Sequence, residues 1–245
     1  MSRPPPSATL GRNAPAWLRD GPATLFLCAA AALAAGSARA EGPDLSGVWL
    51  LDGHVGAVKT SDGTAPPLLP AARAVYDRHR AAAAHGDYSF DGLTRCLPPG
   101  LPRLMLVHEP FEILQKPKVL YFVHQLNRLP RRVYLDEALP ADPDPLYLGY
   151  SVGHWDGGTL VVESTGFLDS TLLDNSGLPH SDALHLTERY QLSADGRHLH
   201  LHYTVEDPKT FSAPWSADAS FTRQKGLELT EEVCAATPAD ERPRS

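Results

Sequence analysis

Apolar and polar residues alternate in short runs along most of the chain after residue 103. Side chains of a β-strand point alternately to its two faces, so a period of two predicts strands. Turns rich in glycine and aspartate at 155–159 and 193–197 separate two pairs of runs and are typical of hairpins. The predicted strands cover 44–50, 103–107, 111–115, 119–127, 132–136, 146–155, 159–165, 183–192, 198–206, 216–224 and 228–234.

One segment has the features of a helix instead. Residues 70–84 begin with proline, continue with alanine and arginine, and are followed by Gly86. Many short strands with one early helix predict an all-β fold, either a closed antiparallel β-barrel or a β-sandwich. A closed barrel leaves no strand edge exposed, so we expect the barrel, with the helix at its periphery.

The N-terminal residues have the pattern of an export signal. Arginines precede an apolar run at 23–36, which is too short to span a bilayer comfortably. Small residues at the outer positions of 38–40 form a cleavage site. We therefore predict a signal peptide at 1–40 that is cleaved after Ala40, a periplasmic or secreted location, and no membrane insertion after processing.

The remainder divides into a single β-barrel domain at 41–236 and a proline-rich, charged tail at 237–245 that we expect to be disordered. The whole chain has a net charge of −7, and its first forty residues carry four arginines and one aspartate, which leaves −10 for the rest. This acidity argues against nucleic acid or an anionic lipid surface as a partner. The residues do not define an oligomeric state.

Two cysteines, Cys96 and Cys234, remain after the predicted cleavage. In an oxidising compartment, two cysteines suggest one disulfide, and the chain-entropy estimate for so long a loop is about 5 kcal/mol. The alternative is a pair of unrelated buried thiols. The predicted export favours the disulfide.

A carboxylate interrupts an apolar strand face within residues 174–192. The period of two places Glu188 on one face together with Leu184, Leu186, Tyr190 and Leu192. A buried carboxylate without a partner is costly. We therefore expect that Glu188 either forms an ion pair with an arginine from another strand or is a catalytic group. Arg132, which shares a strand face with Tyr134 and Asp136, is the expected source of the cation.

If Glu188 is an acid–base group, burial would poise its carboxyl for proton transfer. We then expect His180 as its partner, with Arg132 or Tyr134 stabilising a developing oxyanion. The other residues predicted to bind the ligand are His185, Asp174, Trp155, Tyr121 and His124. For the last three, a place in the core or in a cavity wall is the alternative.

Three histidines share one face of the predicted strand at 198–206. They are His198, His200 and His202, and they alternate with Leu199, Leu201 and Tyr203. Two of them could bind zinc or copper with a third ligand from a neighbouring strand. A polar row facing solvent explains the same pattern without a metal. We predict no metal site and no cofactor.

Residues 149–153 match the G-x-S-x-G pattern of a nucleophile elbow, which needs a strand, a sharp turn and then a helix. A hairpin sequence at 154–162 follows instead. We therefore expect a glycine-rich strand rather than a serine hydrolase.

Several motifs together resemble a large family of exported bacterial proteins, most of them uncharacterised. The motifs are Gly149–Phe167, with the pattern G-x-S-x-G-x-W-D-G, Gly177–Ser181, His185, Glu188–Arg189, Asp207–Lys209 and Pro214–Trp215. The resemblance covers roughly residues 44–234, departs from the usual pattern at 135–138 and 156–158, and implies a lipocalin-like barrel.

Three function classes are consistent with these features. The first is a cofactor-independent acid–base enzyme, such as an isomerase, lyase or cyclase, that acts on a small apolar or aromatic ligand. The second is a non-catalytic periplasmic binding or carrier protein, and the third is a structural envelope protein. In the first two classes, a small-molecule site lies in the interior or mouth of the barrel.

Overall fold

The computed structural model describes residues 42–232 and 234. The predicted signal peptide at 1–40 and the predicted tail at 237–245 lie outside the described residues. Of the helices in the described part, none is both long and apolar enough to cross a membrane.

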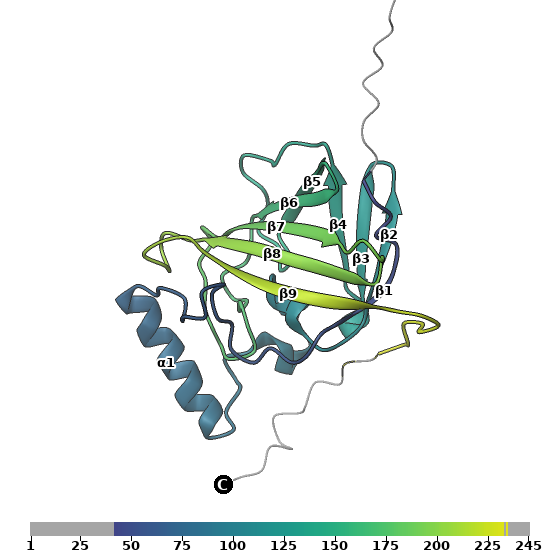
Figure 1. Cartoon of the computed structure of the whole chain (residues 1–245). Helices are drawn as coiled ribbons and strands as arrows, with labels where there is room; N and C mark the ends of the chain where they lie inside the picture. The colour runs from purple at the N-terminus through teal and green to yellow at the C-terminus, as the bar shows by residue number, and fades with distance from the viewer. Residues whose placement is uncertain (1–41, 233, 235–245) are drawn as a thin grey trace, which may run out of the picture. The chain divides into compact units, whose positions relative to one another are not determined.

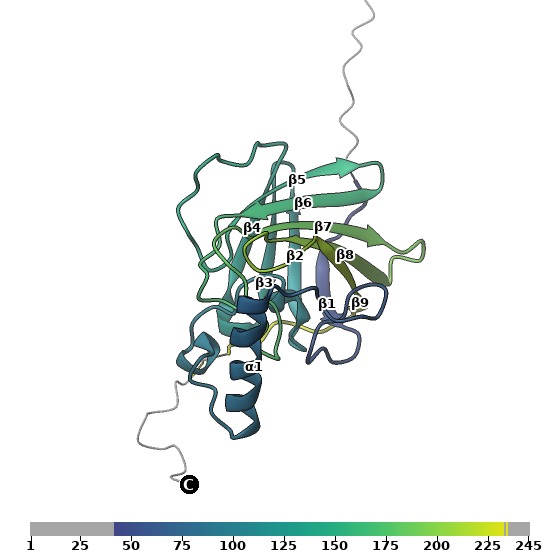
Figure 2. The same ribbon diagram turned by 90° about the vertical axis from the view of Figure 1, so that its left-hand side faces the viewer.

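Within the described residues, nine strands close a barrel in sequence order, as Figures 1 and 2 show from two sides. The strands are β1 (Gly47–Leu51), β2 (Phe111–Lys116), β3 (Val119–His124), β4 (Pro130–Leu135), β5 (Tyr150–Asp156), β6 (Thr159–Thr165), β7 (His185–Leu192), β8 (His198–Glu206) and β9 (Trp215–Gln224). β9 pairs with β1 and closes the barrel. The predicted all-β barrel is confirmed, and the sandwich alternative is wrong.

One pair of neighbouring strands is parallel. β4 and β5 run in the same direction, while every other neighbouring pair is antiparallel. A parallel pair requires a crossover connection, because the chain must return before it can run the same way again. Residues 136–149 make this return, so β5 begins four residues later than predicted, at Tyr150.

The predicted helix is present as α1 (Pro70–Ala84), which lies outside the barrel in both views (Figures 1 and 2). The predicted strand at 103–107 is wrong, because a 3-10 helix, η2 (Arg103–Leu106), occupies these residues. Its backbone bonds are local, from Leu104 N to Gly100 O and from Met105 N to Pro102 O. The predicted strand at 228–234 is also wrong for residues 228–232, since a closed barrel offers no edge for another strand.

Large apolar side chains fill the barrel. Trp49, Phe122, Tyr190 and Phe221 have no exposed surface, and the apolar residues of η2, Leu104 to Leu106, belong to the same core. At the start of the described chain, Leu45 is buried and its carbonyl accepts a hydrogen bond of 3.0 Å from Trp49 Nε1. The interior therefore holds packed side chains rather than an open channel.

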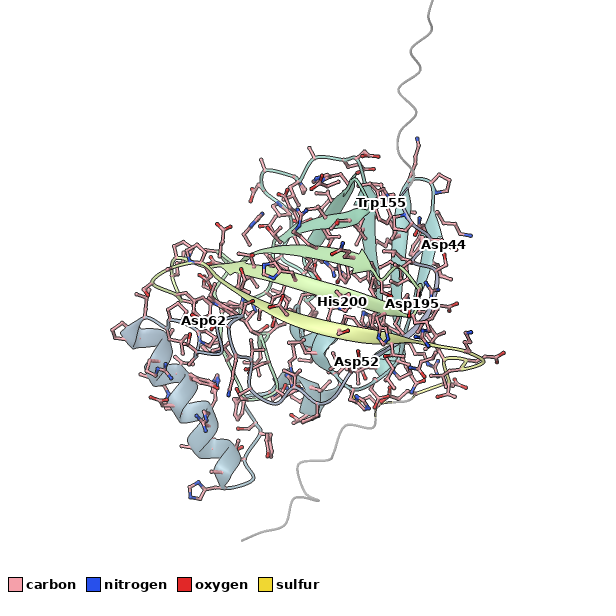
Figure 3. All side chains as sticks on the ribbon, viewed as in Figure 1. Asp44, Asp52, Asp62, Trp155, Asp195 and His200 are labelled. Carbon is pink, nitrogen blue, oxygen red and sulfur yellow. A yellow bond between two sulfur atoms is a disulfide. The ribbon has the colours of Figure 1, made fainter. Side chains whose placement is uncertain are left out.

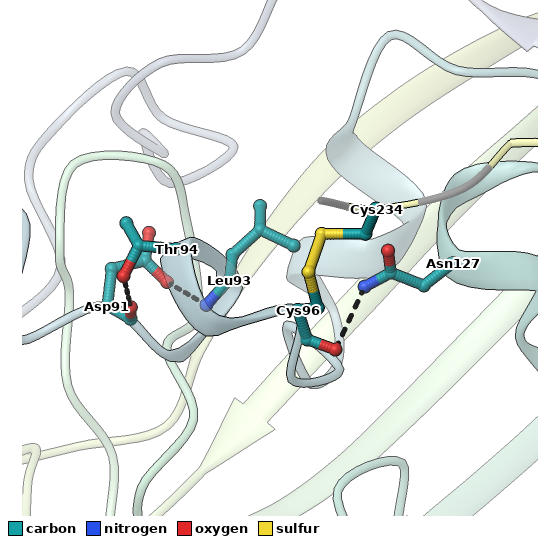
Figure 4. The surroundings of a disulfide bond; sticks show 6 residues. All are labelled: Asp91, Leu93, Thr94, Cys96, Asn127 and Cys234. Carbon is teal, nitrogen blue, oxygen red and sulfur yellow. Dashed lines mark hydrogen bonds between the residues drawn. A yellow bond between two sulfur atoms is a disulfide. The ribbon is translucent and has the colours of Figure 1, made fainter. Parts of the chain in front are cut away.

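Cys96 and Cys234 form the predicted disulfide, with Cα atoms 5.7 Å apart (Figure 4). Asn127 Nδ2 donates a hydrogen bond of 3.5 Å to the carbonyl of Cys96. Two further contacts hold the same segment near β3, namely an exposed ion pair of Arg128 with Glu231 and a bond from Thr230 N to Gln125. The disulfide thus joins the C-terminal part of the described chain to the segment that follows α1.

Candidate functional site

A polar cluster lies inside the barrel and is centred on Glu188. Arg131 on β4 donates from Nη1 to Glu188 Oε1 over 3.0 Å, and its Nη2 contacts Oε2 of the same carboxylate. Tyr190, two residues along β7, donates its hydroxyl proton to Glu188 Oε1 over 2.7 Å. The carboxylate that interrupts the apolar face therefore has both a cation and a hydroxyl as partners.

Two serines complete the cluster. Arg131 Nη2 donates to Ser164 Oγ over 3.0 Å, and Arg131 Nε donates to Ser151 Oγ over 3.2 Å. The two serine hydroxyls share a hydrogen bond of 2.8 Å. The ring of Phe122 lies 5.6 Å from the guanidinium carbon of Arg131. These partners provide the extra hydrogen bonds that a buried ion pair needs to offset its desolvation.

No member of this cluster faces solvent. The Glu188 side chain is 0 % exposed and that of Arg131 is 1 % exposed. A carboxylate with no surface accessible to water cannot touch a substrate in this conformation. Of the two interpretations of Glu188, the structure therefore favours the ion pair.

The electrostatics of the cluster favour fixed protonation states. Burial lowers the pKa of Arg131, but the charge of Glu188 and the presence of Tyr190 outweigh burial and hold that pKa above its ordinary value. Burial and the nearby Glu188 raise the pKa of Tyr190 well above 10.0. Arg131 is therefore a permanent cation and Tyr190 a permanent hydrogen-bond donor.

The expected role of Arg132 as the partner of Glu188 is wrong. Alternation along β4 turns Arg131, Val133 and Leu135 inward, so Arg132 and Tyr134 lie on the outer face. Arg132 is exposed and is the cross-strand partner of Tyr121, while Tyr134 stacks on Tyr150 with ring centroids 5.3 Å apart. Three of the predicted site residues thus gather outside the barrel, separated from Glu188 by the sheet.

His180 is buried in the loop that precedes β7, and its contacts do not include Glu188. Its Nε2 shares a hydrogen bond of 2.6 Å with Thr171 Oγ1, and its Nδ1 lies 2.8 Å from the carbonyl oxygen of Ser181. Burial lowers the pKa of His180, against the opposing effects of the Ser181 carbonyl and Asp207. The expected acid–base pair of His180 with Glu188 is therefore not formed.

Asp174 has a structural role in the same loop. One carboxylate oxygen accepts hydrogen bonds from Ser176 N, Ser176 Oγ and Leu178 N, at 2.8 to 3.1 Å. The other accepts from Val58 N, 116 residues earlier in the chain, over 2.8 Å. Asp174 thus joins the loop that precedes β7 to the segment between β1 and α1.

The remaining predicted site residues lie apart from one another. His185 is on the outer face, 3.6 Å from Glu163. Trp155 is half-buried at the end of β5, where Figure 3 labels it, and packs closely against Gly42. His124 is buried inside the barrel and stacks on Phe111 at 5.2 Å, and among the described residues its Nε2 has no hydrogen-bond partner.

His124 gives a test of acid stability. Burial and the charge of Arg131 lower its pKa from 6.5 to about 3. The unfolded chain therefore binds more protons between these values, and stability falls as the pH drops through this window. Between pH 6 and pH 5, we expect the free energy of unfolding to fall by about 1 kcal/mol from this residue.

Urea unfolding at the two pH values measures this effect. His124→Phe should remove about 1 kcal/mol of the difference between pH 6 and pH 5. His54→Gln, at an exposed histidine, is the control and should leave the difference unchanged. An unaltered difference in His124→Phe would show that His124 is not buried in its neutral form.

The three histidines of β8 lie on the outer face and each meets a partner on β9 or beside it. His202 Nδ1 lies 2.7 Å from Asp218 Oδ1, His200 lies 3.4 Å from Ser220 Oγ, and His198 lies 3.4 Å from Thr222 Oγ1. In the described part of the chain, no three His, Cys, Asp or Glu side chains are grouped so that they could hold a metal ion. The histidines therefore form a polar row along the sheet.

A hollow of about 680 Å³ covers part of this row. We call it the outer groove, and it is lined by Asp52, Thr159, Arg189, Gln191, His200, His202, Asp218 and Ser220, with Leu51, Val55, Leu201 and Ala219. Figure 3 labels His200 on β8 and Asp52 beyond β9. The sequence pattern identified the histidines but not the groove, because the groove depends on how five strands and the loop after β1 come together.

Neither a protein-family model nor a curated protein matches the chain.

Proposed function

We propose that this protein is an exported, non-catalytic binding protein for a small molecule and that the outer groove is its ligand site. The observation that carries the proposal is a groove of about 680 Å³ with both polar and apolar side chains in its lining, a volume typical of small-molecule sites. The buried Glu188 cluster, in contrast, offers a ligand no surface. The Cys96–Cys234 disulfide supports export, because such bonds persist in oxidising compartments.

The charges of the groove indicate the ligand class. The charge of Arg189 is offset by Asp156, whose Oδ2 lies 2.8 Å from Arg189 Nη2. Burial raises the pKa of Asp218, but hydrogen bonds from Ser61 and His202 outweigh it and keep that pKa below 3.8. The groove therefore carries the negative charge of Asp218, and Asp52 is a second acidic residue of its lining, so the groove attracts a cation.

The remaining side chains are suited to a ligand with several hydroxyl groups. Thr159, Gln191 and Ser220 each offer a donor and an acceptor, and the ring nitrogens of His200 and His202 add further hydrogen-bonding atoms. We therefore propose a ligand that carries both hydroxyls and an amine, such as an amino sugar. The second function class, a binding or carrier protein, accommodates this ligand without a catalytic group.

Calorimetric titration with three sugars of the same ring size tests the proposal. Glucosamine should bind more tightly than glucose, and glucuronic acid should bind more weakly than either. In Asp218→Asn, we expect glucosamine affinity to fall about 10-fold, the effect of one charge-assisted hydrogen bond, and glucose affinity to change little.

Asp195→Asn is the matched control, because Asp195 is an exposed carboxylate in the β7–β8 turn and does not line the groove. It should leave the affinity for glucosamine unchanged. Equal affinity for all three sugars, or an equal loss in both variants, would contradict the proposed site. Loss of the preference for glucosamine in Asp218→Asn alone would support it.

A further inference from the structure

A second pocket lies between α1 and the segment that joins β1 to this helix. Its volume is about 180 Å³. Val58, Pro66, Leu68 and Leu178 provide apolar surface, and the buried ring of Tyr76 forms part of the wall. Cavities of about 150 Å³ lined by apolar residues hold a benzene-sized molecule, so this pocket has room for one ring.

Three cations line this pocket, which we call the helix pocket. Arg73 and Arg80 are seven residues apart on α1, and their guanidinium carbons lie 5.9 and 5.8 Å from the centre of the Tyr76 ring. Positions separated by seven residues lie on the same face of a helix. Lys59 reaches the pocket from the opposite segment.

None of the three cations forms an ion pair with a carboxylate of the described residues. The chain as a whole has a net charge of −7, so carboxylates are more numerous than cations. Three unpaired cations around one hollow repel each other and attract an anion.

The walls of the helix pocket are held by hydrogen bonds. The Tyr76 hydroxyl and Ser176 Oγ lie 2.6 Å apart, and His79 Nδ1 lies 2.8 Å from the carbonyl oxygen of Gly177. Asp174 accepts hydrogen bonds from the backbone N–H groups of both Val58 and Leu178, which line the pocket. The pocket is therefore formed in advance of binding, which lowers the entropy cost of taking up a ligand.

We propose that the helix pocket binds a small aromatic carboxylate, with its ring against the apolar wall and its carboxylate between Arg73, Arg80 and Lys59. Arginine suits this role because its planar guanidinium can donate two parallel hydrogen bonds to one carboxylate. The site is distinct from the outer groove and has the opposite charge preference.

Titration with benzoate, benzyl alcohol and benzylamine tests the charge preference with a constant ring. Benzoate should bind at least 10-fold more tightly than benzyl alcohol, and benzylamine should show no binding. Acetate, which has the carboxylate without the ring, should bind more weakly than benzoate. Raising the salt concentration should weaken benzoate binding, because the cations are exposed to solvent.

Variants then locate the site. Arg73→Gln and Arg80→Gln should each weaken benzoate binding about 10-fold, as expected for the loss of a charge-assisted bond. Arg78→Gln is the matched control, since Arg78 is exposed on the same helix and does not line the pocket. It should leave the affinity unchanged. An equal loss in Arg78→Gln would show that the general charge of α1, not the pocket, attracts benzoate.

A blocking variant keeps the test independent of charge and of folding. Ala65 is exposed at the pocket, and Ala65→Trp should fill it while all three cations remain. Benzoate binding should then be lost, with the melting temperature of the protein preserved. Binding in Ala65→Trp that equals that of the wild type would overturn the proposal. Asp218→Asn should not change the affinity for benzoate. A failed prediction for the helix pocket is therefore distinguishable from a failed prediction for the outer groove.

Discussion

Glu188→Gln is expected to lower the free energy of unfolding by about 3–5 kcal/mol, the usual effect of removing one partner from a buried ion pair. The substitution preserves the shape of the side chain but leaves the charge of Arg131 buried and uncompensated. The Arg131 side chain is only 1 % exposed, too little for water to solvate its charge instead. Urea unfolding followed by tryptophan fluorescence measures the loss.

Removing the charges together should be far less harmful. In the triple variant Arg131→Met, Glu188→Leu and Tyr190→Phe, no buried charge or unpaired hydroxyl of these three residues remains, and Ser151 and Ser164 keep their mutual bond. We expect this variant to recover most of the stability that Glu188→Gln loses, because apolar replacements of buried ion pairs are often neutral or stabilising. The comparison separates the cost of one orphaned charge from the net contribution of the pair.

Glu163→Gln is the control on the neighbouring strand. Glu163 lies on the outer face of β6 with its side chain 43 % exposed, so its contact with His185 is screened by water. Its replacement should change stability by less than about 0.5 kcal/mol. If Glu188→Gln were as stable as this control, the cluster would not be structural, and the acid–base interpretation of Glu188 would again be favoured.

Local sequence patterns were sufficient for several elements. The predicted ends of α1, β6 and β8 agree with the structure, because each has a clear period and strong turn residues at its ends. The inward position of Glu188 also followed from the period of two. The partner of Glu188 was misassigned by one residue, although Val133 and Leu135 alternate with Arg131 and indicate the inward face of β4.

Other features depend on contacts between distant parts of the chain. The parallel pairing of β4 with β5 is a choice of neighbour that no local pattern encodes. The outer groove combines β1, β6, β7, β8 and β9 with the loop after β1, and the helix pocket combines α1 with Val58 and Leu178. The loop of residues 174–181 was expected to serve the chemistry of Glu188. It instead bonds to Tyr76 and His79 of α1 and to Val58 of the segment between β1 and α1.

Removal of the disulfide should lower the free energy of unfolding by about as much as Glu188→Gln does. Cys96 and Cys234 are separated by 138 positions, and the chain-entropy model gives a stabilisation of about 5 kcal/mol for a loop of this length. Domains of this size are stable by only about 5–15 kcal/mol, so the double variant Cys96→Ser, Cys234→Ser should unfold at a much lower urea concentration. The reduced wild type should behave like the double variant.

The effect should arise mainly in the unfolded state, since several contacts of the folded state do not need the disulfide. Gln125 still binds Thr230 and Arg128 still meets Glu231, so the barrel should keep its circular dichroism spectrum without the bond. Reducing agent added to the double serine variant is the control and should have no effect. If the double serine variant were as stable as the wild type, the disulfide would contribute nothing to the free energy of unfolding. A large loss would make full stability depend on an oxidising compartment, as the proposed export requires.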